Sequence, residues 1–226
     1  MTIPKLLLEV QNRRSDIIQL TSDLIKIPTI NPPGTNYREI CEFLSKRLKK
    51  SGFDVDIIRA KGALADTDKY PRFNLVARHE GTYSGPCIHF NSHIDVVDTG
   101  HGWTRDPFGG SIEGDKIFGR GSCDMKGGLA SSIVAAEVFI SIFPKYYGAI
   151  EISATADEET GGYGGVAWLA EKGYFNPKKV QSVIIPEPLN KDRICLGHRG
   201  VWWSEIETKG RVAHGSMPFL GDCAIR

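Results

Sequence analysis

The chain has 226 residues, of which 41% are hydrophobic and 24% are charged, and its formal net charge is +1. This size and composition are typical of a globular protein with one ordinary core, or with one core and the start of a second domain. Because the charge is near zero and no long basic or acidic block occurs, we expect neither nucleic acid nor an anionic membrane as a partner.

No membrane or export signal is recognised in the sequence. The most apolar segment, residues 129–143, is too short to span a bilayer and contains Ser131, Ser132 and Glu137. The N-terminal residues lack the apolar region of a signal peptide, and the five scattered cysteines contain no C-x-x-C pair. Reduced thiols of this kind are typical of the cytoplasm, which is the location we expect.

Helices and strands are predicted to alternate along residues 4–185. An amphipathic helix is expected over 4–26 and a second over 37–50, with a proline-rich loop at 31–34 between them. The later elements are strands at 55–59, 74–78, 87–91, 112–118, 149–156 and 181–185, and helices at 126–143 and 164–172. The apolar run at 181–185 predicts a buried strand. This alternation predicts an α/β fold in which helices flank a sheet.

The pattern changes after Pro188. Residues 194–197 and 201–208 have the alternation of two antiparallel strands, as in Val201, Trp203 and Glu205. We therefore expect a first domain over 1–190 and the beginning of a second, smaller domain over 191–226.

The first candidate site segment follows the strand predicted at 87–91. His93 lies at the end of that apolar strand and projects from it, and Asp95 lies two residues later, on the same side of an extended chain. A metal-ligating imidazole needs its other ring nitrogen held by an acceptor, which Asp95 can supply. A histidine that only caps the strand beside a turn aspartate is the alternative interpretation.

The second segment is a glycine-rich loop at 119–128 that contains Asp124. Glycines allow the backbone to come close enough for one carboxylate to bridge two metal ions. A phosphate-binding loop is disfavoured, because the run is neither G-x-G-x-x-G nor a P-loop. An ordinary helix N-cap by Asp124 remains open.

The third and fourth segments carry acidic residues after predicted buried strands. Asp157, Glu158 and Glu159 are consecutive, and Glu187 stands between two prolines. Clustered carboxylates repel one another and need cations, and adjacent glutamates can divide metal binding and proton transfer between them. A solvated acidic turn and an exposed linker acid are the alternatives. A histidine and carboxylates at successive strand ends, without thiolates, favour zinc or a similar divalent ion in a hydrolase.

Together with WTRDPF at 103–108 and GRGSCDMKG at 119–127, these segments resemble the co-catalytic dizinc deacylase and carboxypeptidase family. Its members include acetylornithine deacetylase, succinyl-diaminopimelate desuccinylase, aminoacylase and bacterial glutamate carboxypeptidase. The resemblance covers nearly the whole chain. It implies a zinc-peptidase-like catalytic domain with a mixed sheet, the start of an inserted α+β lid that mediates homodimerisation, and two Zn²⁺ ions per subunit, for which Co²⁺ can substitute.

The resemblance also implies metal ligands. His93 and Glu187 match ligands of one ion, Glu159 matches a ligand of the other, and Asp124 matches the bridging carboxylate, which is usually followed by a cis peptide bond. The family takes its last metal-binding histidine from a later C-terminal segment, and none of the six histidines here is an obvious replacement. We therefore expect either a fragment of a longer protein or a second metal that lacks one ligand.

Four further residues receive roles from the resemblance or from their charge. Glu158 matches the catalytic acid and base, Asp95 matches the residue that orients His93, and His214 matches the lid histidine that stabilises an oxyanion in the partner subunit's active site. Arg199 is a candidate contact for a substrate carboxylate. On residues alone, His214 is an ordinary turn residue.

The expected reaction is metal-dependent cleavage of the amide bond of a small N-acyl amino acid. Acetylornithine deacetylase and succinyl-diaminopimelate desuccinylase provide the nearest resemblance. Two alternatives stay open: a dipeptidase or carboxypeptidase of the same family, and a truncated, non-catalytic dimerisation module.

Overall fold

The computed structural model describes residues 3–190, 192–197, 199–200, 202 and 204–225. Contacts divide the chain into two compact units, Met1–Pro188 and Leu189–Arg226. The first unit contains all of the predicted metal ligands, so its fold determines how they are arranged.

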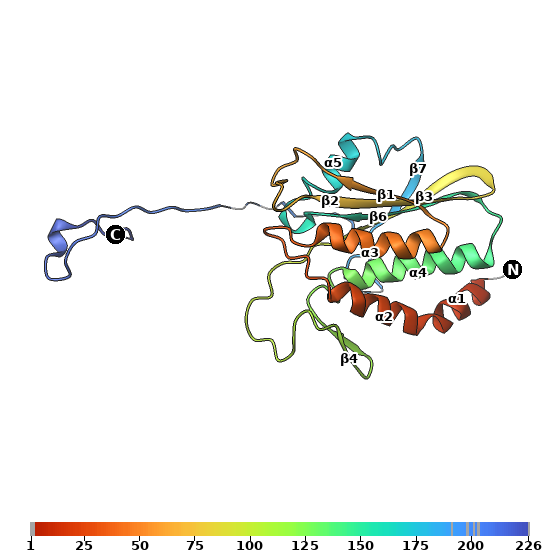
Figure 1. Cartoon of the computed structure of the whole chain (residues 1–226), viewed down its shortest axis with the longest axis horizontal. Helices are drawn as coiled ribbons and strands as arrows, with labels where there is room; N and C mark the ends of the chain where they lie inside the picture. Colours follow the sequence, from red (N-terminus) through yellow and green to blue (C-terminus); the bar gives the residue numbers. More distant parts are fainter. Residues whose placement is uncertain (1–2, 191, 198, 201, 203, 226) are drawn as a thin grey trace. The chain divides into compact units, whose positions relative to one another are not determined.

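The first unit is built on a mixed sheet with the strand order β1-β2-β6-β3-β7 (Figure 1). The strands are β1 (Asp54–Arg59), β2 (Phe73–Glu80), β3 (Tyr83–His93), β6 (Tyr147–Thr155) and β7 (Val180–Ile184). β2 runs antiparallel to β1 and β6, whereas β3 runs parallel to β6 and β7. The predicted α/β fold with a mixed sheet flanked by helices is therefore confirmed.

Helices lie on both sides of this sheet (Figure 1). They are α1 (Ile3–Asn12), α2 (Arg14–Ile25), α3 (Tyr37–Lys50), α4 (Lys126–Ile142) and α5 (Val166–Glu171). α3 and α4 pack against one side of the sheet and α2 packs on α4, while α5 lies on the opposite side (Figure 1). None of the described helices is long and apolar enough to cross a membrane.

The core of the first unit lies between the sheet and the α3–α4 layer. α3 turns Ile40, Leu44 and Leu48 toward the sheet, because residues four apart share one face of a helix. These side chains are fully buried in one cluster with Ile152 and Ala154 of β6. The core therefore fixes the position of β6, and with it the start of the acidic segment that follows this strand.

The helix predicted over 4–26 is in fact two helices that meet at Arg13. The backbone of Arg13 has φ −91° and ψ 11°, which is outside the helical range. Its guanidinium contacts Asp16 and lies 2.9 Å from Glu137 on α4. This local pair and the tertiary pair with Glu137 accompany a break that no glycine or proline marks in the sequence.

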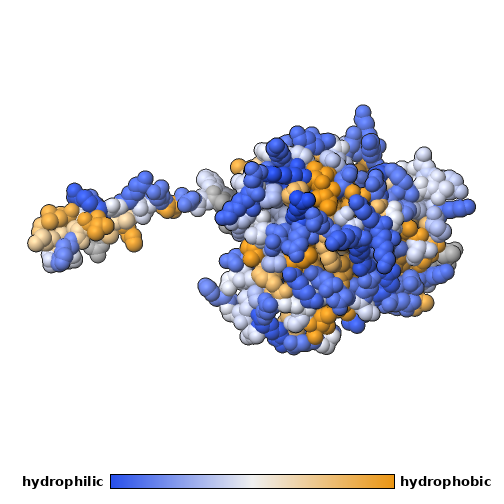
Figure 2. Space-filling model, viewed as in Figure 1, coloured by the Kyte–Doolittle hydropathy of each residue, from blue (hydrophilic) through white to orange (hydrophobic). Residues whose placement is uncertain are grey.

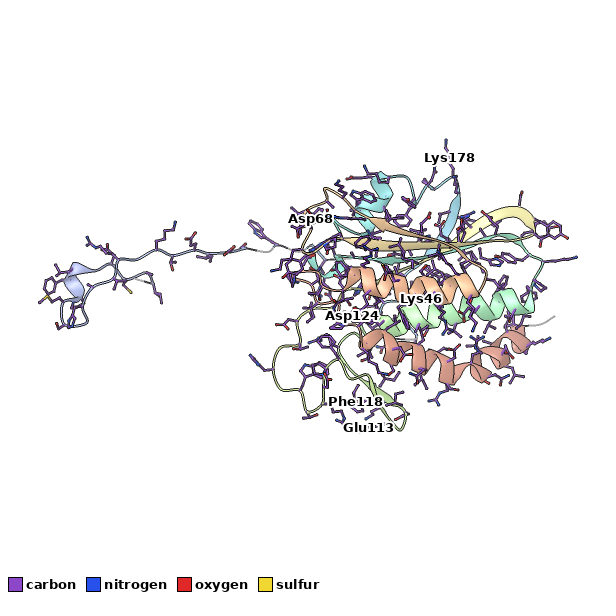
Figure 3. All side chains as sticks on the ribbon, in the orientation of Figure 1. Lys46, Asp68, Glu113, Phe118, Asp124 and Lys178 are labelled. Carbon is purple, nitrogen blue, oxygen red and sulfur yellow. The ribbon has the colours of Figure 1, made fainter. Side chains whose placement is uncertain are left out.

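The strand predicted over 112–118 is a hairpin of β4 (Ser111–Glu113) and β5 (Lys116–Phe118). The labels of Glu113 and Phe118 mark it in Figure 3. Gly114 makes the turn with a φ of 60°, a conformation that glycine adopts without steric cost.

β7 matches the strand predicted at 181–185, but the expectation that it is buried is wrong. Val183 and Ile184 are 53% and 45% exposed. β7 ends the strand order and, among the strands that the structure describes, pairs only with β3. Apolar composition leads to burial only where a neighbour covers the strand, and no described residue of this chain covers the outer edge of β7.

The two antiparallel strands predicted at 194–197 and 201–208 do not form in the described part of the second unit. Val201 and Trp203 lie outside the described residues. Antiparallel pairing occurs instead as an isolated bridge between Arg211 and Asp222. None of the described residues of this unit is buried, and Figure 2 shows its apolar side chains at the surface. A strand pair without a core to pack on has little independent stability, which accounts for the difference.

Candidate metal centre

Segments far apart in the sequence meet at the carboxyl ends of β3 and β6. The parallel register places His93, the last residue of β3, beside Thr155. The short helix η1 (Glu158–Thr160) follows β6, and Asp124 lies just before α4 (Figure 3). α/β folds bind their ligands at this end of parallel strands.

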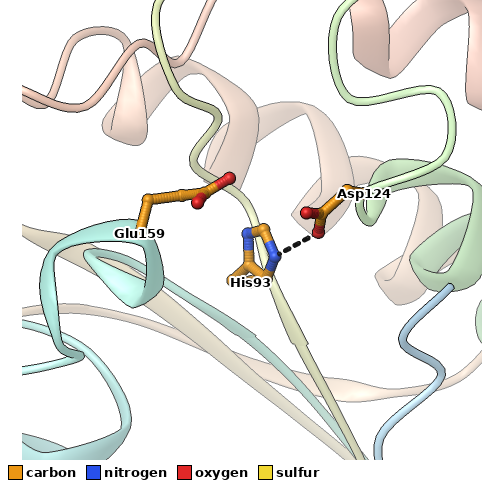
Figure 4. A group of neighbouring side chains, drawn as sticks. All are labelled: His93, Asp124 and Glu159. Carbon is orange, nitrogen blue, oxygen red and sulfur yellow. Dashed lines mark hydrogen bonds and ion pairs between the residues drawn. The ribbon is translucent and has the colours of Figure 1, made fainter. Parts of the chain in front are cut away.

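His93 lies at the centre of an acidic cluster (Figure 4). Its Nε2 is 3.0 Å from Oδ1 of Asp124, 3.7 Å from Oε1 of Glu187 and 3.9 Å from Oε2 of Glu158. Glu159 points toward the same imidazole from η1 (Figure 4). The structure thus brings together His93, the three carboxylates predicted to bind metal, and Glu158.

The other nitrogen of the His93 ring has a defined partner. Nδ1 lies 2.9 Å from the backbone carbonyl oxygen of Asp95, and 3.6 Å from Oδ1 of the Asp95 carboxylate. A carbonyl oxygen only accepts hydrogen bonds, so Nδ1 carries a proton and donates it. In the neutral ring the lone pair is therefore on Nε2, which faces Asp124, and this is the nitrogen available to a metal.

The fully buried carboxylate of Asp95 forms most of its hydrogen bonds with the acidic turn that follows β6. It accepts hydrogen bonds from the backbone N–H groups of Glu158 and Glu159, each at 3.1 Å. The side-chain amide of Asn31 donates to the same carboxylate at 2.9 Å. Asp95 thus holds the two glutamates in place with its carboxylate and His93 with its carbonyl.

Mutual repulsion and burial change the acidity of the cluster. Burial raises the pKa of Glu187 to about 7, and the charges of Asp124 and Glu158 act in the same direction. Burial and the charge of Asp124 likewise raise the pKa of Glu159. Burial opposes the charged form of His93, but Asp124, Asp95 and Glu187 outweigh it and raise the pKa of the imidazole to about 11. A positive charge is therefore strongly favoured among these carboxylates.

The residues present fit a divalent metal. One ligand atom from each of His93, Asp124 and Glu159 lies within 4.8 Å of the other two. The donors are an imidazole nitrogen and carboxylate oxygens, which suit zinc and similar divalent ions. The peptide bond between Asp124 and Met125 is cis, as the resemblance implies.

Sequence reasoning missed two polar residues whose hydrogen bonds support the segments around the centre. Asn31 bonds both Asp95 and Thr160, although its segment was predicted only as a loop. Lys126 is buried and donates to the carbonyl oxygens of Leu24 at 2.9 Å and Ile27 at 2.8 Å, which ties the start of α4 to the end of α2. Asn31 stands in a proline-rich loop and Lys126 in the glycine-rich segment that leads into α4, and neither local pattern identifies the distant partner of the side chain.

His214 and Arg199 belong to the second unit. The Nδ1 of His214 lies 2.8 Å from the hydroxyl of Ser216, and Arg199 is exposed. Their assigned roles remain predictions.

Comparison with known proteins places the chain in a family. Residues 89–219 match the model of peptidase family M20/M25/M40. A probable succinyl-diaminopimelate desuccinylase of Staphylococcus epidermidis is 35% identical over 212 residues, which are 93% of this chain and 48% of that protein. The succinyl-diaminopimelate desuccinylase of Pseudomonas syringae pv. tomato is 32% identical over 213 residues, 91% of this chain and 52% of that protein. The chain thus spans about half the length of the curated relatives it matches.

Solved structures share the fold at lower identity. Human carnosine dipeptidase 1 has a TM-score of 0.67 at 19% identity, over 81% of this chain and 41% of that one. An M20 family metallo-carboxypeptidase from Sulfolobus solfataricus has a TM-score of 0.61 at 22% identity, over 75% and 37%. The Bacillus subtilis YXEP protein, described as a dinuclear metal binding peptidase from the M20 family, has a TM-score of 0.53 at 17% identity, over 77% and 43%. With the family model and the desuccinylase relatives in agreement, the chain belongs to peptidase family M20/M25/M40.

Proposed function

We propose that the protein containing this chain is a metal-dependent hydrolase that cleaves the amide bond of a small N-acyl amino acid, with succinyl-diaminopimelate as the first candidate substrate. The observation that carries the proposal is the cluster of His93, Asp124 and Glu159, with Glu158 at its exposed side. The desuccinylase relatives, at 32–35% identity, support the substrate class.

Two zinc ions per subunit are the proposed cofactors, and Co²⁺ is the proposed substitute. His93 and Glu187 would hold one ion, Glu159 the other, and Asp124 both. When bound, such ions polarise the amide carbonyl and make water more acidic. The donor set and the short distances around His93 support this assignment.

Glu158 is the proposed proton carrier of the reaction. Its side chain is 53% exposed, so water and substrate can reach it, and Oε2 is 3.9 Å from Nε2 of His93. A carboxylate in this position can take a proton from the attacking water and return it to the leaving amine. His214 is proposed to stabilise the oxyanion across a homodimer, and Arg199 to contact a substrate carboxylate.

The test is Glu158→Gln in the complete protein. The amide keeps the shape of the side chain but cannot accept the proton, so we expect kcat to fall by about 10²–10⁴ while the zinc content stays unchanged. Glu171→Gln, which changes an exposed glutamate of α5, is the control and should behave like the unchanged protein. Near-normal turnover in Glu158→Gln would contradict the assignment.

A substrate panel separates the remaining alternatives. Hydrolysis of succinyl-diaminopimelate or acetylornithine supports the deacylase, whereas preference for unblocked dipeptides points to a dipeptidase. Metal binding without hydrolysis of any of these amides points to a non-catalytic module.

A further inference from the structure

A buried ion pair lies next to the acidic turn and has no part in the proposed chemistry. The Nε of Arg72 donates to Oδ2 of Asp157 at 2.9 Å, and both side chains are 3% exposed. The hydroxyl of Tyr37, also buried, donates to Oδ1 of the same carboxylate at 3.1 Å. We call Arg72, Tyr37 and Asp157 the Arg72 clamp.

The clamp holds the residue at which the chain turns toward the metal centre. Asp157 has a φ of 63°, a left-handed conformation that is uncommon for residues other than glycine. Its carbonyl oxygen accepts hydrogen bonds from the N–H groups of Thr160 at 3.2 Å and Gly162 at 2.6 Å. Since Glu158 and Glu159 follow directly, the conformation of Asp157 decides where both glutamates point.

Both ends of the turn are also tied to β2. The side chain of Asn74 accepts from the N–H of Ala156 at 2.8 Å and donates to the carbonyl oxygen of Gly164 at 2.9 Å. A Cβ atom at Gly164 would overlap the carboxylate of Asp157 and the side chain of Arg72, so the turn closes tightly over the clamp. Arg72 itself is fixed by bonds from its NH1 to the carbonyl oxygens of Pro33, at 2.7 Å, and Tyr70, at 2.8 Å.

We propose that Arg72 is a positioning residue of the metal centre, which through Asp157 sets the turn that presents Glu159 as a ligand and Glu158 as the proton carrier. The connection runs from Arg72 to Asp157, then through the N–H groups of Glu158 and Glu159 to the Asp95 carboxylate, and from the Asp95 carbonyl to His93. The inference rests on the proposed function for the roles of the two glutamates. Arg72 itself would not touch the metal and would act through Asp157.

The test compares Arg72→Met with Arg47→Met in the complete protein. Arg47 is the matched control, because it also joins carboxylates, Asp16 at 2.8 Å and Glu137 at 2.6 Å, but on the α2–α3–α4 side of the fold. In the metal-free protein, we expect hydrogen–deuterium exchange to speed up over residues 156–165 in Arg72→Met and to stay unchanged there in Arg47→Met.

Titration with cobalt(II) and kinetics complete the comparison. We expect Arg72→Met to bind one cobalt ion tightly instead of two, and to lose about 10–100-fold in kcat with little change in KM, the usual effect of removing a residue that supports a ligand. Arg72→Lys should recover part of the loss, because the lysine restores the charge beside Asp157. Arg47→Met should keep both ions and its kcat.

Two results would overturn the inference: unchanged exchange over 156–165 in Arg72→Met, or equal losses in Arg72→Met and Arg47→Met. If Arg72→Met does not fold, Tyr37→Phe replaces it, with Tyr146→Phe as its control, because the Tyr146 hydroxyl bonds with His79 and, among the described residues, with no part of the acidic turn. A several-fold weaker second cobalt site in Tyr37→Phe alone is expected, and equal values in both variants overturn the inference.

Failure of the unchanged protein to bind two ions would instead refute the proposed function, whereas the exchange experiment tests the clamp without metal.

Discussion

At the scale of single residues, Asp95 makes more contacts than its predicted role requires. Its carbonyl oxygen accepts a hydrogen bond from Nδ1 of His93, while its carboxylate accepts hydrogen bonds from the two N–H groups of η1 and from the amide of Asn31. One buried residue therefore links the histidine of β3 to the turn after β6. An orienting carboxylate alone would need only the contact with His93.

Replacing Asp95 by asparagine separates these contacts. The variant keeps the backbone carbonyl that fixes His93, but it places an amide NH₂ opposite an N–H group of Glu158 or Glu159. Two donors then face each other, so we expect a loss of about 2 kcal/mol in the free energy of unfolding and a fall of about 10–100-fold in kcat. Urea unfolding and steady-state kinetics measure the two effects. Asp98→Asn is the control, because the Asp98 side chain, within the described part of the chain, bonds only with the neighbouring Thr99. The same losses in both variants would contradict this account.

The sequence predicts the acidic residues of the site but not the residues that hold them. His93, Asp124, Glu158 and Glu159 stand in short motifs, and the strand ends that carry them follow from apolar patterns. Arg72 is 85 positions from its partner Asp157. A contact of that separation depends on which strands become neighbours, and a single sequence does not encode it in any local pattern.

At the scale of elements, hydrophobic periodicity predicts where helices and strands form. It predicts less well at which residues they end and which other elements cover them. The helix at 37–50 and the strands around 87–93 and 147–155 are found because a regular apolar pattern is their own property. The break at Arg13, the exposure of β7 and the absence of the predicted strands from the described residues after Pro188 depend on other elements. Each of these differences comes from a neighbour that is present or missing, not from the residues of the element itself.

The ion pairs at the Arg13 break predict how stability depends on pH. Hydrogen bonds from Arg47, and then from Arg13, hold the pKa of Asp16 in the folded protein well below its ordinary value. The carboxylate therefore contributes stability above the pKa of the unfolded chain, about 4, and this contribution is lost as the pH falls below that value. We expect Asp16→Asn to be less stable than the unchanged protein at pH 7, and the difference to shrink between about pH 5 and pH 3.

Thermal unfolding over this pH range measures the effect. Asp23→Asn is the control, because Asp23 pairs with Lys26 at 3.2 Å on the exposed side of α2 and such pairs contribute little. A stability difference for Asp16→Asn that is the same at pH 3 and pH 7 would contradict the assignment.

At the scale of the whole molecule, a net charge of +1 conceals a strong local imbalance. The carboxylates of Asp124, Glu158 and Glu187 all lie within 4 Å of one imidazole nitrogen, and Glu159 joins them. In the metal-free protein these carboxylates repel one another, and the protonated imidazole of His93, whose pKa they raise to about 11, offsets part of that repulsion. The raised pKa values of Glu187 and Glu159 show that repulsion remains, and a bound divalent ion would offset it.

Metal binding should consequently raise the melting temperature of the protein. An ion at one hundred times its Kd stabilises the folded state by about 2.7 kcal/mol, which for a unit of this size corresponds to roughly 5–10 °C. We expect zinc added to the chelator-treated protein to give a shift of this size. His93→Ala should abolish most of the shift, because it removes the nitrogen on which the carboxylates converge, whereas His101→Ala, at an exposed position in a loop, should keep it. An equal shift in both variants would mean that zinc stabilises the fold from another place, and the cluster around His93 would then not be its binding site.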